Sequence, residues 1–115
     1  MKPNYHFALN ERLGIELPYL HTDWEELSHE ERHDMILRWE KIKAHIPDRI
    51  MEVEKQIEQR QLQVAQEEDW DTVCRLYEEI YTFASIINDL HIWARVNQDF
   101  EETPDLAEEH QNREK

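Results

Sequence analysis

Trp70–Phe100 reads WDTVCRLYEEIYTFASIINDLHIWARVNQDF, and this longest apolar pattern in the chain decides the fold. The stretch contains neither glycine nor proline, so no residue in it stops a helix. Its apolar positions recur at alternating spacings of four and three, which is the period of one helical face. We therefore expect one long helix here. Its principal stripe consists of Val73, Tyr77, Ile80, Ala84, Ile87, His91 and Ala94.

The apolar arc of this expected helix is wider than a single partner helix requires. A wide arc implies more than one neighbour, so we interpret this helix as the central one. Asp69 precedes it and is a suitable N-cap, because a short acceptor side chain can bond a free N–H group at a helix start. Free cysteines are usually buried, so we expect an inert, buried thiol at Cys74. The residues that flank the principal stripe are Leu76, Phe83 and Leu90 on one side and Trp70, Cys74 and Tyr81 on the other.

Two further helices are expected upstream of the long one. Ser28 and Glu31 form a Ser-x-x-Glu capping box, in which each side chain bonds the backbone N–H of the other residue. This box predicts a helix over residues 29–46. Pro47 ends that helix and suits the first turn of the next one, over residues 48–67. The link to the long helix is very short, so the last two helices should form an antiparallel hairpin.

The first 22 residues are expected to form an irregular but ordered arm. Pro3, Gly14 and Pro18 break any long helix there, yet the arm is too apolar for a free tail. We expect one helical turn over Asn10–Leu13, with Gly14 as its stop. Residues 23–27 are expected to form a short helix.

The predicted fold class is therefore all-α, a small antiparallel bundle of three main helices with an irregular N-terminal arm. A chain of 115 residues is one domain by size. We place this single helical domain at residues 1–100, with the arm at 1–22 and the last helix at 70–100. Residues 101–115 are polar and are expected to form a disordered tail. A single glycine and four prolines argue against a turn-rich β fold.

The expected helix over residues 48–67 is too short and too thinly apolar to cover its partner. At 1.5 Å per residue, the helix over residues 48–67 spans about 30 Å and the helix over residues 70–100 about 45 Å. Since the two start together at their short link, the shorter helix ends near Leu90. The stretch after Leu90 therefore needs cover from the first helix and the arm. Apolar surface remains even then, and we expect the chain to form a homodimer, the commonest closed assembly. The predicted interaction surface consists of Tyr81, Phe83, Ile86, Leu90 and Trp93.

The chain is strongly acidic, with a formal net charge of -14 at pH 7. This charge argues against direct binding to nucleic acid, which depends on Lys and Arg at phosphates, and against docking on anionic membranes. It suits a partner protein with a basic surface. The chain has one cysteine, no apolar leader and no run of about 20 apolar residues that could span a membrane. We therefore expect a cytoplasmic protein.

The sharpest chemical motif is His29-Glu30-Glu31-Arg32-His33, which matches the pattern H-E-x-x-H. On a helix, histidines four residues apart share one face and can hold zinc while the glutamate activates a bound water. Both x positions are charged here, and the motif opens a helix, so two surface histidines are the simpler interpretation. We keep His29 and His33 as weak metal candidates. We expect no catalytic residue and no cofactor.

A short resemblance lies at the start of the long helix, over Asp69–Ile80. This run resembles the second half of the UvrB/UvrC-type hairpin motif, a helical hairpin used for protein–protein contacts. The resemblance implies the same architecture here, with the hairpin serving as a contact element. The residues that match in type are Trp70, Asp71, Leu76 and Ile80, and those that depart from the motif are Val73 and Tyr77.

The function expected from these features is a non-enzymatic protein–protein interaction or regulatory module. Its expected partner is a second copy of the chain or an unidentified protein with a basic surface. One alternative is a metal-dependent hydrolase that uses the His29-Glu30-x-x-His33 motif. Another is an acidic mimic of nucleic acid, or an inhibitor, which occupies a basic site on another protein. Stoichiometric bound metal would favour the hydrolase, and salt-sensitive capture of a basic partner would favour the mimic.

Overall fold

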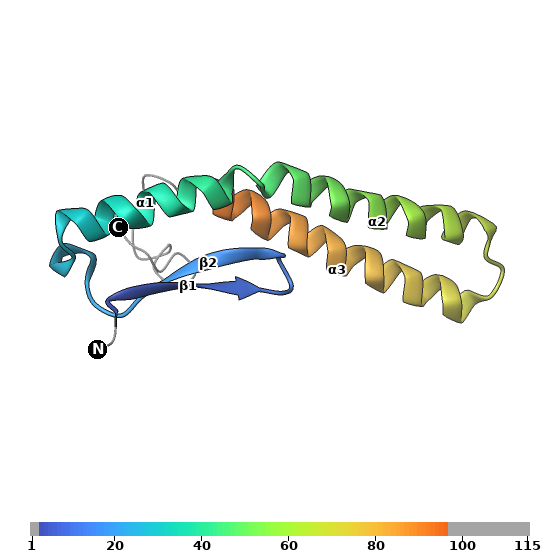
Figure 1. Ribbon diagram of the computed structural model, residues 1–115. Coiled ribbons are helices and arrows are strands. Elements are labelled where there is room, and N and C mark those ends of the chain that lie inside the picture. The colour runs from blue at the N-terminus through green and yellow to red at the C-terminus, as the bar shows by residue number, and fades with distance from the viewer. Residues whose placement is uncertain (1–2, 97–115) are drawn as a thin grey trace, which may run out of the picture.

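The computed structural model describes residues 3–96, which form two strands and three helical segments (Figure 1). The strands are β1 (Tyr5–Asn10) and β2 (Ile15–Leu20), and a short 3-10 helix, η1 (Trp24–Glu26), follows them. The helical segments are α1 (His29–Lys43), α2 (Ile46–Gln66) and α3 (Trp70–Ala94). Within residues 3–96 no helix is long and apolar enough to cross a membrane. The predicted helix over residues 70–100 is too long, because α3 ends at Ala94 and Arg95 is its C-cap. Residues 97–100 and the predicted tail at 101–115 lie outside the described residues.

The predicted all-α class is wrong, because the N-terminal arm is a β-hairpin. The strands β1 and β2 pair antiparallel, with Tyr5 opposite Leu20. In the turn between them, the Leu13 N–H donates to Asn10 Oδ1 at 2.9 Å and the Gly14 N–H donates to the Asn10 carbonyl oxygen at 2.7 Å. Gly14 has a φ of 78°, in the left-handed region that favours glycine. The turn predicted at this glycine therefore reverses a strand and does not end a helix.

The predicted bundle of three helices is also wrong, because α1 and α2 run on as one long bent helix (Figure 1). Only Ala44 and His45 separate the two segments. Pro47 lies in the first turn of α2, where its missing N–H and its ring disturb the turn before it. The helix axis therefore bends at this point without reversing. As a result, α1 extends beyond the α2–α3 pair and does not fold back along it.

The predicted helix starts at His29 and Trp70 are confirmed by their capping contacts. The side chain of Ser28 accepts from the Glu31 N–H at 3.1 Å, and Glu31 Oε1 accepts from the Ser28 N–H at 2.9 Å. At the start of α3, Asp69 Oδ2 accepts from the Thr72 N–H at 3.0 Å. These bonds satisfy N–H groups that have no partner inside their own helix.

The helices α2 and α3 lie side by side and antiparallel, as predicted from their short link (Figure 1). The link covers residues 67–69 only. Val53 in α2 and Leu76 and Ile80 in α3 are buried. The α2–α3 pair lies along the longest dimension of the described structure, whose principal extents are 59 × 31 × 25 Å.

The main core lies where α1, the N-terminal half of α2, the β-hairpin and the C-terminal half of α3 meet. Met35 and Trp39 from α1 and Leu90 from α3 are completely buried, at 0% exposure. The ring of Trp93 packs edge-on against Trp39, with centroids 5.8 Å apart. The end of α3 that α2 does not reach is therefore covered by α1 and the β-hairpin. The buried members of this core are Leu13, Ile15, Leu17, Trp24, Leu27, Met35, Trp39, Ile46, Val53, Ile86, Leu90 and Val96.

Two arginines attach the β-hairpin turn to the helices. Arg12 donates hydrogen bonds of 2.8 Å to Asp89 Oδ2 and to Ser85 Oγ, both on α3. Arg49 Nε on α2 donates to the Leu13 carbonyl oxygen at 2.9 Å. These contacts place the β-hairpin along one side of α3 and leave another side of this helix uncovered.

Candidate protein-interaction surface

One side of α3 carries an exposed row of residues without a single charge. Its members alternate in spacing by four and three, so they share one helical face. Every one of them is exposed, with Trp70 at 73%, Tyr81 at 67% and Tyr77 at 43%. Charged residues make up 35% of the chain, so an uncharged row of this length is unusual for its surface. We call this row the exposed stripe; it consists of Trp70, Cys74, Tyr77, Tyr81, Ala84, Asn88 and His91.

The aromatic residues of the exposed stripe gather in its N-terminal half. The rings of Tyr77 and Tyr81 stack with centroids 6.3 Å apart and an interplanar angle of 27°. Trp70 lies two helical turns before Tyr77 on the same face. Stacked rings on a helix lose little conformational freedom on binding, and each ring has an apolar face and a polar edge. Surfaces of this kind are typical of the centres of protein–protein contacts.

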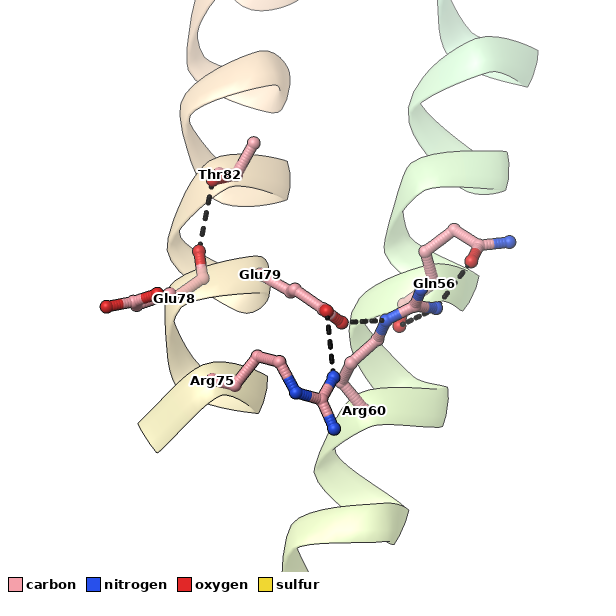
Figure 2. Close-up of polar contacts among 6 residues, drawn as sticks. All are labelled: Gln56, Arg60, Arg75, Glu78, Glu79 and Thr82. Atoms are coloured by element: carbon pink, nitrogen blue, oxygen red, sulfur yellow. Dashed lines mark hydrogen bonds and ion pairs between the residues drawn. The ribbon is translucent and has the colours of Figure 1, made fainter. Parts of the chain in front are cut away.

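A network of side chains holds α3 against α2 beside this region (Figure 2). Arg60 of α2 donates from Nε to Glu79 Oε1 at 3.1 Å, and Arg75 of α3 donates to Glu79 Oε2 at 3.1 Å. The Arg60 guanidinium also lies over the ring of Phe83, 5.1 Å from its centroid, and donates to Gln56 Oε1 at 2.6 Å. The hydrogen bond from Arg60 is the main cause that lowers the pKa of Glu79 below its ordinary value. The Arg60–Glu79 contact joins α2 to α3 next to the exposed stripe.

The structure separates the five residues predicted to form the interaction surface. Tyr81 is exposed, and Phe83 is half-buried beneath Arg60. Ile86 and Leu90 are buried, at 6% and 0% exposure, so they are not available to a partner of the folded chain.

Trp93 is half-buried and packs against Trp39 of α1. Ile86 and Leu90 belong to one core cluster with residues of β2, α1 and α2, and Trp93 packs against this cluster.

Most members of the exposed stripe were missed as contact residues. Trp70 and Cys74 appeared only as the edge of a wide apolar arc, and Cys74 was predicted to be buried. That prediction is wrong, because the thiol-bearing residue is exposed. His91, a member of the predicted principal stripe, is exposed as well. The signal that could have found the stripe is the four-and-three spacing counted from Trp70 instead of Val73.

The two metal candidates lie on the first turn of α1. His29 and His33 are exposed, and together with Glu30 and Asp34 they line a surface depression of about 490 Å³. Among the residues that the structure describes, no group of three or more His, Cys, Asp or Glu side chains is arranged to hold a metal ion. A zinc site with only two protein ligands would lack the third that catalytic zinc sites use.

Comparison with known proteins does not assign this chain to a family. No protein-family model matches it, and no similar protein is found among curated sequences or solved structures.

Proposed function

We propose that this chain is a non-enzymatic, cytoplasmic protein–protein interaction module, and that the exposed stripe of α3 is its contact surface. The observation that carries this proposal is the exposure of Trp70, Tyr77 and Tyr81 on a face that has no charge. Exposed apolar patches cost free energy in water, and on stable soluble proteins they commonly mark contact sites.

The composition of the exposed stripe supports a protein partner. Contact centres are enriched in Trp and Tyr and depleted in charged residues, and the stripe has both properties. The Arg60–Glu79–Arg75 network supports the proposal in a second way (Figure 2). It holds α3 in place before a partner arrives, so little ordering is needed on binding.

Site-specific photo-crosslinking in cells tests this proposal. A benzophenone amino acid placed at Tyr81 samples the exposed stripe. The matched control is the same amino acid at Leu62 on α2, because the two side chains are almost equally exposed, at 67% and 66%. We expect a discrete crosslinked protein from position 81 that is absent from position 62. No adduct at position 81, or identical adducts at both positions, would refute the proposal.

A further inference from the structure

The exposed stripe has two unlike halves, and their difference limits what can pack on it. The N-terminal half carries the large rings of Trp70, Tyr77 and Tyr81. The C-terminal half carries the small or polar residues Ala84, Asn88 and His91, and the exposed residue Arg95 follows them. A partner that fills this surface must therefore be small where the stripe is bulky and bulky where it is small.

From this asymmetry we infer that the occupant of the exposed stripe is a second copy of the chain, packed so that the two α3 helices run antiparallel. A two-fold axis perpendicular to α3 brings the N-terminal half of one stripe onto the C-terminal half of the other. Each bulky ring then meets a small or polar residue. The inference rests on the proposed function, because it names the partner of the same surface.

The pairing that this arrangement implies can be written residue by residue. Four layers follow if the helices cross midway between positions 81 and 84. Large and small side chains alternate across them, as they do in well-packed helix pairs. In the last of these layers the Arg95 guanidinium of one copy meets the indole face of Trp70 in the other, which is an attractive cation–π pair. The layers are Tyr81 with Ala84, Tyr77 with Asn88, Cys74 with His91, and Trp70 with Arg95 of the second copy.

A parallel pair would fit less well. It would place each residue opposite its own copy, so that Trp70 and Tyr81 crowd while Ala84 leaves a gap. It would also bring the two copies of Glu78, which flanks the stripe, to the same level. In the antiparallel pair the residue at the level of Glu78 is the uncharged Ile87 instead. The absence of charge in the stripe is what lets two chains of net charge -14 approach along this face.

The exposed area is consistent with a small, reversible dimer. An aromatic side chain buries about 150–250 Å², and the exposed fractions of Trp70, Tyr77 and Tyr81 are 73%, 43% and 67%. The three rings therefore offer about 370 Å² per copy, or about 700 Å² in a pair. A specific interface needs at least about 1,000 Å² in total. The other members of the exposed stripe and its flanks must supply the remainder.

Sedimentation of the purified 115-residue chain in reducing buffer is the first part of the test. We expect a concentration-dependent shift from 14.2 kDa toward twice that mass. Tyr81→Glu places a charge at the centre of the stripe and should raise the dimer dissociation constant at least about 30-fold. The matched control is Leu62→Glu, which adds the same charge at equal exposure on α2 and should leave the dimer intact.

The direction of the pair is tested by disulfide formation, because Cys74 is the only cysteine of the chain. His91→Cys adds a second thiol on the same exposed stripe. Positions 74 and 91 of one chain lie about 25 Å apart along α3, at 1.5 Å per residue, which is too far for an internal disulfide. Oxidised glutathione should therefore convert the His91→Cys variant to a covalent dimer. The same treatment of the wild-type chain should not, since the two copies of Cys74 lie about 25 Å apart in the antiparallel pair.

Three results would overturn this inference. A chain that stays at 14.2 kDa at high concentration has no self-contact on this face. A dimer that survives Tyr81→Glu, or that dissociates equally with Leu62→Glu, uses another surface. Rapid formation of a Cys74–Cys74 disulfide in the wild type indicates a parallel pair. If the chain is a monomer but position 81 still crosslinks to a different protein, this inference fails while the proposed function stands.

Discussion

Leu90 and Tyr81 lie on the same helix and were both predicted to face a partner, yet the structure gives them opposite environments. Leu90 is 0% exposed and belongs to the main core, whereas Tyr81 is 67% exposed. The substitutions Leu90→Ala and Tyr81→Ala should therefore have very different effects on the free energy of unfolding. The comparison tests directly whether the β-hairpin covers the C-terminal half of α3.

The loss in free energy of unfolding expected for Leu90→Ala follows from the complete burial of the Leu90 side chain. Leu→Ala removes three side-chain carbon atoms. Burial of each stabilises the fold by about 0.8 kcal/mol, so their loss costs about 2.4 kcal/mol. The cavity left behind adds roughly 24 cal/mol per Å³ of unfilled volume, so a total of about 3–4 kcal/mol is expected. Tyr81→Ala removes a mostly solvated ring and should change the stability of the monomer by no more than about 0.5 kcal/mol.

Urea denaturation followed by circular dichroism measures both changes. The protein should be dilute enough to be monomeric, so that dissociation does not contribute. We expect the Leu90→Ala midpoint to fall with an unchanged dependence on urea concentration. A loss below about 1 kcal/mol for Leu90→Ala, or an equal loss for Tyr81→Ala, would refute the assignment of core and surface on α3.

Four further substitutions test the fold around this surface. Gly14→Ala should destabilise the chain by at least about 1–2 kcal/mol, because φ is 78° and a Cβ there would lie 2.5 Å from Arg49 Nε. An unchanged urea unfolding curve for this variant would contradict the left-handed turn. Arg60→Ala should lower the free energy of unfolding by about 1 kcal/mol. This loss should exceed that of Arg75→Ala, since the Arg60 side chain is 25% exposed and that of Arg75 is 59% exposed. Equal losses for the two variants would contradict the role given to the Arg60 contact. The lowered pKa of Glu79 implies stability that is fully present above its unfolded value near 4.5 and is lost as the pH falls through the lower folded value. Thermal melts from pH 6 to pH 3 should therefore show a smaller loss for Glu79→Gln than for the wild type, and parallel losses would count against this sign.

The sequence did not show which residues of the α3 apolar arc form the exposed stripe. The wide apolar arc of α3 indicated more than one neighbour, and Tyr81, one of the five residues predicted to face a partner, is exposed. Ile86 and Leu90, however, are buried, while Trp70 and Cys74 are exposed. Both flanks of the arc are apolar, so composition alone could not show which flank the rest of the chain would cover.

The N-terminal arm was misread for a related reason. Gly14 and Pro18 were interpreted only as residues that stop a helix. In the structure Gly14 makes the turn of a hairpin, and Pro18 lies in β2 of a sheet with only two strands. Proline is tolerated there because an edge strand leaves many N–H groups unpaired. The two-residue period of the flanking apolar residues was the signal for strands.

The sequence by itself determined the local features of this protein. The capping box at Ser28, the N-cap at Asp69 and the short link between α2 and α3 depend on contacts between residues close in the chain. Such contacts can be inferred from spacing and residue type. Only the tertiary structure decided that α1 continues the axis of α2 and that the β-hairpin docks on α3 through Arg12. Those arrangements depend on long-range packing, and they decide which side of α3 stays exposed.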